Sequence, residues 1–215
     1  MNRKGIVMCA GNGTRLKPIT NSTSKHLLQV YDKPMIYYPL SILMLANIKD
    51  FLFITNSEHQ SQYKKLFGDG SLLGINIEYA IQENNGGIAE GLILAEDFLD
   101  SSPSLLILGD NLFYGDSFEK NLIKNSLKQD GATIFLQRVR DPQRFCVALL
   151  NEEGNKIIEL VEKPVTIKSD LGVMGIYFFD KYASSYAKTL KKSKRNELEI
   201  TDLNKIYLQK NKLKF

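Results

Sequence analysis

Short apolar runs alternate with longer amphipathic segments along the first two thirds of the chain. The apolar runs have the length of buried strands and lie at residues 5–10, 51–55, 75–80, 105–108 and 133–139. The segments between them suit helices and lie at residues 34–46, 60–67, 88–99 and 117–129. Pro34 suits the first turn of its helix, and Asp116 or Ser117 suits the cap of the last one. Alternating strands and helices predict a largely parallel sheet covered on both faces.

After Arg140 the pattern changes to shorter strand-like runs, which lie at residues 145–150, 157–161 and 172–179. Two helices at 181–190 and 198–208 follow, and then a strand-like stretch at 212–215. We therefore expect an α/β protein with a Rossmann-like, doubly wound, mostly parallel (mixed) sheet and a small antiparallel lobe. Residues 1–140 and 141–215 would form the two parts of a single domain over 1–215.

Composition restricts the class of protein. With 215 residues, of which 43% are apolar and 24% charged, the chain can bury the core of one globular domain. The longest apolar-leaning segment, 35–48, is too short to span a bilayer, so no membrane partner is expected. Cys9 and Cys146 imply no disulfide framework, which favours the reducing cytoplasm. Residues 181–215 are strongly basic, but no recognition motif accompanies them, so we expect a solvated helix face and no nucleic-acid partner.

A glycine-rich turn at residues 11–18 directly follows the first apolar run. A strand that ends in Gly-x-Gly exposes backbone N–H groups to an approaching anion, and Arg15 and Lys17 add positive charge there. The turn is not a P-loop, because the chain contains no Gly-Lys-Ser/Thr. It is not a dinucleotide-binding fingerprint either, because Leu16 stands where the third glycine belongs. The turn predicts a phosphate cradle of another kind, with an ordinary strand-to-loop turn as the alternative.

Polar clusters follow two other predicted strands at the same edge of the sheet. Their members are Gln82, Asn84, Asn85, Gly86 and Gly87 after the strand at 75–80, and Gly109, Asp110 and Asn111 after the strand at 105–108. In open α/β sheets, ligands bind outside the carboxyl ends of the strands. The two clusters and the glycine-rich turn therefore predict a nucleotide pocket.

Six segments carry the motifs of one enzyme family. They are Gly11-x-Gly13-Thr14-Arg15-Leu16-x-Pro18, Ser24-Lys25, Tyr31-Asp32-Lys33-Pro34-Met35-Ile36-Tyr37-Tyr38-Pro39-Leu40, Gly109-Asp110-Asn111, Glu162-Lys163-Pro164 and Glu197-Leu198-Glu199-Ile200-Thr201-Asp202. In this order they resemble the sugar-1-phosphate nucleotidylyltransferases, and within them the thymidylyltransferase branch. The resemblance implies transfer of a thymidylyl group from dTTP to glucose 1-phosphate. The products would be pyrophosphate and dTDP-glucose, which opens dTDP-rhamnose and related deoxysugar synthesis for cell-surface polysaccharides.

The resemblance further implies a nucleotide half at 1–140. Arg15 and the turn residues Gly11, Gly13 and Thr14 would hold the triphosphate. Lys25 would lie against the phosphates near the attacked phosphorus. Gln82 would contact the thymine edge together with the Gly87 backbone. Asp110 would ligate Mg²⁺, a hard cation that suits carboxylate and phosphate oxygens.

A sugar-side lobe at 141–215 would complete the site. By the same resemblance, Lys163 would neutralise the phosphate of glucose 1-phosphate, and Glu162 would accept hydrogen bonds from the sugar hydroxyls. Asn111, Cys146 and Val173 are further candidates for sugar contacts. In such an in-line displacement, positioning and electrostatics do most of the catalysis, so Arg15, Lys25, Asp110 and Lys163 form the expected catalytic set.

The chain departs from the family's pattern in several places. Asn12 replaces a common Gly, and His26 replaces a usual Gln, for which we expect a structural role. Cys146 stands where the family usually has Gly, and residues 170–174 also differ. Family members continue beyond 212–215 into a segment with Trp-x-Asp, whose Asp is a second metal ligand, and they tend to form homotetramers. Because that segment is absent here, we expect reduced turnover. Two alternatives stay open: a non-catalytic nucleotide-binding remnant or regulatory partner, and a related enzyme that uses UTP or CTP.

Overall fold

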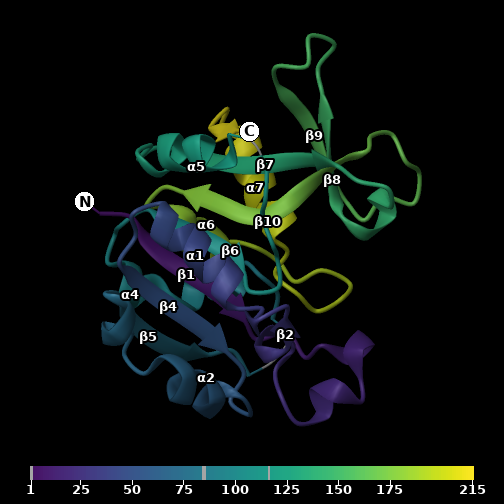
Figure 1. Ribbon diagram of the computed structural model, residues 1–215. Helices are drawn as coiled ribbons and strands as arrows, with labels where there is room; N and C mark the ends of the chain where they lie inside the picture. Colours follow the sequence, from purple (N-terminus) through teal and green to yellow (C-terminus); the bar gives the residue numbers. More distant parts are fainter. Residues whose placement is uncertain (1, 84–85, 116) are drawn as a thin grey trace.

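The computed structural model describes residues 2–83, 86–115 and 117–215, and it is built around a mixed sheet (Figure 1). The strands of this sheet are β1 (Lys4–Cys9), β4 (Asp50–Thr55), β5 (Asn76–Ile81), β6 (Ser104–Leu108), β7 (Ala132–Arg138), β8 (Cys146–Leu150), β9 (Ile157–Glu162), β10 (Leu171–Phe179) and β11 (Leu213–Lys214). They follow the order β5–β4–β1–β6–β10–β7–β11, with β8 paired to β10 and β9 paired to β8. The expected α/β class with a mixed sheet is confirmed.

Four parallel strands form the part of the sheet that carries the glycine-rich turn. β1 lies between β4 and β6, so that Val7 stands opposite both Phe53 and Ile107, and β5 lies outside β4. Successive side chains of a strand point to opposite faces. Accordingly, Ile6 packs into one hydrophobic cluster and Val7 into the other. Burial on both faces explains why these strands read as continuous apolar runs.

Helices cover both faces of the sheet. On the face of Val7 lie α1 (Tyr37–Leu45), α2 (Gln60–Phe67) and α5 (Phe118–Ser126). On the face of Ile6 lie α3 (Glu90–Leu94), α4 (Glu96–Leu99), α6 (Ala183–Ala187) and α7 (Ile200–Gln209). Among the helices of the described residues, none is both long and apolar enough to pass through a membrane.

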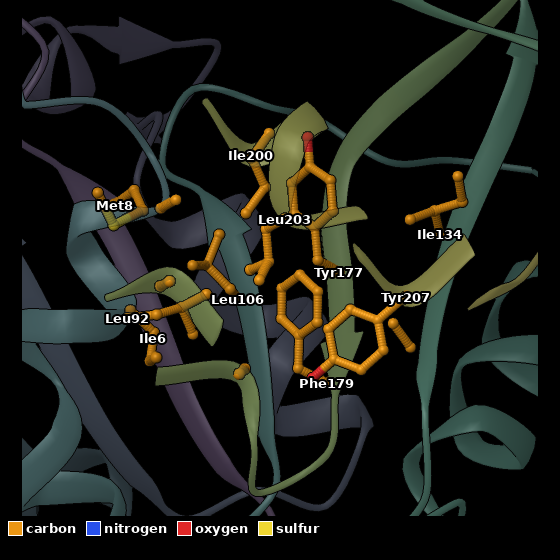
Figure 2. Packing of buried hydrophobic residues seen from close by; sticks show 14 of the residues in the cluster. Ile6, Met8, Leu92, Leu106, Ile134, Tyr177, Phe179, Ile200, Leu203 and Tyr207 are labelled. Carbon is orange, nitrogen blue, oxygen red and sulfur yellow. The ribbon is translucent and has the colours of Figure 1, made fainter. Parts of the chain in front are cut away.

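The helix α7 is fixed to the sheet by an aromatic contact and a buried hydrogen bond. Figure 2 shows Tyr207 of α7 beside Phe179 of β10, and their ring centroids are 5.6 Å apart. The hydroxyl of Tyr207 donates to Oδ1 of Asp180 at 2.7 Å, and Oδ2 of Asp180 accepts the N–H of Gly131 at 2.9 Å. These contacts place the start of α7, which carries Thr201, at the edge where the parallel strands end.

The strands β8 and β9 form an antiparallel hairpin that extends beyond the main sheet (Figure 1). β8 joins the sheet where Val147 pairs with Gly172 of β10. β10 itself runs antiparallel to both β6 and β7, with a register shift between Val173 and Tyr177. The hairpin therefore supplies the expected antiparallel element, while β10 and β11 lie within the main sheet. The division of the domain at residue 140 stays a prediction.

Two predicted helices differ from the structure. Pro34 belongs to β3 (Lys33–Pro34), which pairs with β2 (Gln29–Val30), and not to a helix. The N–H of Met35 donates to the carbonyl of Leu28 at 2.9 Å, which holds this stretch in the ribbon until α1 begins at Tyr37. The predicted helix at 88–99 is divided into α3 and α4.

The predicted cap of α5 is wrong for one of its two candidates. Ser117 precedes the helix with a φ of 62°, and its side chain makes no capping hydrogen bond. A serine oxygen caps a helix from an extended backbone conformation, which Ser117 does not have. Asp116, the other candidate, lies outside the described residues, as do Asn84 and Asn85.

Candidate active site

A cavity of about 350 Å³ lies at the carboxyl ends of the parallel strands, between them and the β8–β9 hairpin. The predicted site residues that line it are Gly11, Lys25, Gln82, Gly87, Asp110, Cys146, Glu162, Lys163 and Val173. Four others do not line it: Gly13, Thr14, Arg15 and Asn111. A larger hollow of about 770 Å³ lies between β9 and α7 and shares only Glu162 with the predicted site.

Within the glycine-rich turn, Gly13 is the position that needs glycine. Gly13 has a φ of 59°, and a Cβ there would lie 2.9 Å from Cγ2 of Thr20. A Cβ on Gly11 would lie 3.0 Å from Cε of Lys25. The positive φ falls on Gly13, so Asn12 adopts no left-handed conformation and the turn tolerates it. Thr14 and Arg15 follow in an exposed 3₁₀ turn.

Lys25 and Asp110 form an ion pair at the centre of the cavity wall. Nζ of Lys25 lies 2.5 Å from Oδ2 of Asp110, and both side chains remain partly accessible. Oδ1 of Asp110 accepts a hydrogen bond from Nδ2 of Asn111 at 3.2 Å. Burial opposes ionisation of Asp110, but the charge and hydrogen bond of Lys25 outweigh it and hold the pKa of the carboxyl below its usual range. The carboxyl group of Asp110 is therefore ionised at neutral pH.

A cluster of buried polar side chains packs against the short 3₁₀ turn that carries Lys25. Oγ of Ser24 lies 2.9 Å from Nδ1 of His26 and 2.7 Å from the hydroxyl of Tyr63. Burial lowers the pKa of His26 to about 3, so the ring is neutral. A Cβ on Gly109 would lie 2.9 Å from Cδ2 of His26, which places the ring against the residue that precedes Asp110. This geometry agrees with the structural role expected for His26.

Gln82 lines the cavity and is almost fully buried. Its backbone N–H continues the sheet by donating to Thr55 at 2.8 Å. Its side-chain Nε2 donates to the carbonyl of Gly87 at 2.9 Å and to Oε2 of Glu90 at 2.6 Å. Gly87 has a φ of 92° and approaches the backbone of Leu198 so closely that a Cβ would lie 2.4 Å from its carbonyl oxygen.

The opposite wall of the cavity is formed by the hairpin and the start of α7. Glu162 pairs in register with Cys146, and its Oε2 accepts from Oγ1 of Thr201 at 2.5 Å. Nζ of Lys163 lies 3.7 Å from Oε1 of Glu162. Burial raises the pKa of the Cys146 thiol to about 11, so the thiol is protonated at neutral pH.

Comparison with known proteins decides the family. The sequence profile of the nucleotidyl transferase family matches residues 4–215. The chain belongs to this family. It is 51% identical to the glucose-1-phosphate thymidylyltransferase of Neisseria gonorrhoeae, over 96% of this chain and 71% of that protein. The enzyme of the same name from Mycobacterium tuberculosis is 43% identical, over 98% of this chain and 72% of that protein.

Solved structures agree with this placement. A Bacillus anthracis protein classed as a glucose-1-phosphate thymidylyltransferase, crystallised with sucrose, superposes with a TM-score of 0.90 at 42% identity. The match covers 99% of this chain and 85% of that one. A UDP-glucose pyrophosphorylase with bound UDP-glucose shares the fold at 22% identity and a TM-score of 0.82. The protein is thus a nucleotidyltransferase, and the non-catalytic alternative is not favoured.

The nucleotidyl transferase cavity also contains an arginine that sequence reasoning missed. Arg195 lies 2.7 Å from Glu199, 3.2 Å from Glu197 and 3.4 Å from Glu162. Burial works against its charge, but these carboxylates outweigh that effect and raise its pKa. The sequence placed Arg195 among the solvated residues of a basic segment. Its position directly before the Glu197–Asp202 motif was the one signal that could have identified it.

The described residues supply few ligands for the metal on which nucleotidyltransferases generally depend. In the described ranges no group of three His, Cys, Asp or Glu side chains is arranged to hold an ion. Asp110 fits as a single oxygen ligand, because its carboxylate is ionised and borders the cavity. Phosphate oxygens and water would have to provide the remaining ligands.

Proposed function

We propose that the protein transfers a thymidylyl group from dTTP to glucose 1-phosphate and releases pyrophosphate and dTDP-glucose. The observation that carries the proposal is the pairing of two walls in one cavity. One wall holds Lys25, Asp110 and Gln82, and the other holds Glu162 and Lys163. An amide at a cavity wall suits a nucleobase edge, whereas a carboxylate beside an ammonium suits a sugar that carries a phosphate.

In the proposed reaction, a phosphate oxygen of the sugar phosphate forms a bond to the α-phosphorus of dTTP, and the bond to the departing pyrophosphate breaks. Lys25 lies where it would contact the phosphates, with the glycine turn residues Gly11 and Gly13 next to it. Arg15, in the exposed turn, would fold over the β- and γ-phosphates together with Thr14. These groups offset the negative charge that accumulates on the leaving group.

Asp110 would hold Mg²⁺, which neutralises phosphate charge when bound. Asp110 and Lys25 are already in contact. The site would therefore offer a carboxylate to the metal ion and an ammonium group to the phosphates at neighbouring positions. The remaining sugar contacts would come from Asn111, Val173 and Cys146. The cytoplasmic location and the homotetramer that the resemblance implies stay predictions.

The sugar phosphate would bind next to Glu162, whose carboxylate is approached by two cationic side chains. Arg195 and Lys163 both approach Oε1 of Glu162, at 3.4 Å and 3.7 Å. Arg195 is also paired with Glu197 and Glu199, so Lys163 would be the main cation that offsets the charge of the phosphate group. The other oxygen of Glu162 accepts from Thr201, which fixes the carboxylate for sugar hydroxyls.

The test is pyrophosphate release from dTTP and glucose 1-phosphate in the presence of Mg²⁺. We expect Asp110→Ala and Lys163→Ala to lower kcat/KM by about 100-fold or more. Asp130→Ala and Lys212→Ala are matched controls, because these residues form a surface ion pair at 2.9 Å that lies outside the cavity. No pyrophosphate above a no-protein control, or full activity of Asp110→Ala, would refute the proposal.

A further inference from the structure

The side-chain amide of Gln82 has both of its donor hydrogens engaged by neighbouring protein groups. Nε2 donates to the carbonyl of Gly87 at 2.9 Å and to the carboxylate of Glu90 at 2.6 Å. A carbonyl and a carboxylate can only accept hydrogen bonds. Rotation of the amide by half a turn would set Oε1 of Gln82 against two acceptors, which is repulsive. The two partners therefore fix which end of the amide faces the ligand.

Glu90 reaches Gln82 because residue 86 has no side chain. A Cβ on Gly86 would lie 1.9 Å from Oε2 of Glu90, so the carboxylate occupies the space that any other residue would fill. Residues 86–89 are also held in place, since the carbonyl of Gly86 accepts from the N–H of Leu198 at 2.7 Å and the N–H of Ala89 donates to the carbonyl of Leu198 at 3.2 Å. Glu90 does not itself line the cavity. It acts through Gln82.

We propose that Glu90 is a positioning residue that sets base selectivity by holding Gln82 with its carbonyl oxygen toward the nucleobase. The inference rests on the proposed function, in which Gln82 contacts the base of the nucleotide. Within the described part of the chain, Oε1 of Gln82 accepts no hydrogen bond, and Gln82 borders the cavity. The nucleobase must therefore present an N–H to this oxygen.

The ring nitrogen N3 distinguishes the pyrimidine bases at this position. In thymine and uracil N3 carries a hydrogen. In cytosine N3 is an acceptor, and the nearest N–H belongs to the 4-amino group, one position further along the edge of the base. A freely rotating glutamine could offer its amide NH₂ to cytosine, but Glu90 and Gly87 prevent that rotation. This hydrogen bond does not involve the 5-methyl group. Glu90 therefore favours binding of thymine and uracil over cytosine and does not discriminate between thymine and uracil.

The experiment measures the affinity of the intact protein for dTTP, dUTP and dCTP by calorimetry. We expect the wild type to bind dTTP and dUTP more tightly than dCTP. In Glu90→Gln, residue 90 can rotate together with Gln82, and we expect the dTTP-to-dCTP affinity ratio to fall about five- to tenfold. Glu90→Leu removes the acceptor, and we expect the same direction of change. The dTTP-to-dUTP ratio should stay constant in both variants.

The matched control is Glu83→Gln. Glu83 carries the same charge beside Gln82 in the sequence, but its carboxylate is exposed and accepts from Oγ of Ser57 at 3.0 Å. Loss of a negative charge near a triphosphate should strengthen binding of all nucleotides alike, so the base ratios of this variant should equal those of the wild type. Thermal denaturation of each variant checks that it is folded.

Two results would overturn the inference, and they are distinct from failure of the proposed function. A selective wild type whose dTTP-to-dCTP ratio is unchanged in both Glu90 variants would remove the role of Glu90 and leave the proposed reaction intact. A wild type that prefers dCTP would contradict the orientation of Gln82 and the thymidylyl donor together. Pyrophosphate release from dTTP by the wild type tests the proposed function separately.

Discussion

The charged side chains of the cavity wall are paired with one another before any ligand binds. Lys25 lies 2.5 Å from Asp110, and Arg195 lies 2.7 Å from Glu199. Side chains already held in one rotamer lose little conformational entropy when an anion binds. The cost is that an incoming phosphate must compete with a carboxylate for each cation. The site is therefore preorganised, and its affinity for anions depends on this competition.

Cys146 should react slowly with alkylating reagents at neutral pH although it lines the cavity. Only the thiolate is nucleophilic, and burial raises the pKa of this thiol to about 11. We expect the rate of carbamidomethylation by iodoacetamide to rise about tenfold per pH unit below that pKa. Mass spectrometry of peptides labelled between neutral and alkaline pH measures it.

Cys9 is the internal control for this labelling, because it is fully buried and should stay unmodified until the protein unfolds. Fast, pH-independent labelling of Cys146 near neutral pH would contradict the prediction. It would mean that a nearby cation lowers the pKa of the thiol and that burial does not control its reactivity.

Sequence reasoning identified candidate residues that belong to recognisable motifs. It missed residues that became candidates only through their side-chain contacts in the fold. The resemblance to the nucleotidylyltransferases assigned Lys25 and Asp110 to one site, and the structure brings the two side chains together. Arg195 was assigned to a solvated segment although Glu197 and Glu199 follow it closely in the sequence. Only its third partner, Glu162, becomes a neighbour through the fold. Glu90 was missed because its contact with Gln82 depends on the empty space at Gly86.

At the level of elements, apolar runs predicted strands better than amphipathic segments predicted the ends of helices. The runs at 51–55 and 105–108 fall inside β4 and β6, because strands buried on both faces have few alternatives. The start of α1 was placed too early, since hydrogen bonds from Met35 and Ile36 back to Leu28 and His26 hold that stretch in an extended ribbon. Local helix propensity carries no information on hydrogen bonds to residues earlier in the chain.

The loop between β5 and α3 should be sensitive to a single added methyl group. Gly87→Ala would place a side chain at a φ of 92° and a Cβ 2.4 Å from the carbonyl oxygen of Leu198. We expect a loss of about 1–3 kcal/mol in the free energy of unfolding. Because Gln82 donates to the carbonyl of Gly87, we also expect weaker dTTP binding. Urea denaturation and calorimetry measure the two effects.

Gly74→Ala separates backbone strain from the close approach to Leu198. Gly74 has a φ of 70°, but a Cβ there would meet open space. We expect it to cost about 1 kcal/mol or less and to leave dTTP binding unchanged. Equal destabilisation by the two substitutions would show that the contact with Leu198 contributes nothing.

At the scale of the whole molecule, one buried arginine joins elements from distant parts of the chain. The guanidinium of Arg3 donates to the carbonyls of Ser104 at 2.5 Å, Phe179 at 2.9 Å and Ser126 at 3.1 Å, and also to that of Lys128. These carbonyls belong to the start of β6, the end of β10 and the end of α5. Burial lowers the pKa of Arg3 to about 10, which reflects the cost of removing its charge from water. Four accepting carbonyls offset that cost.

Arg3→Met should therefore destabilise the whole fold without a direct effect on the cavity, which Arg3 does not line. The substitution keeps an apolar stem of similar length but leaves the carbonyls without their donor, and we expect a loss of about 3 kcal/mol in the free energy of unfolding. Urea denaturation measures it. Arg138→Met is the matched control, because Arg138 is exposed and pairs only with Asp170 at the surface, so its loss should cost about 0.5 kcal/mol or less. If both variants unfold at the same urea concentration, Arg3 does not stabilise the junction of β6, β10 and α5.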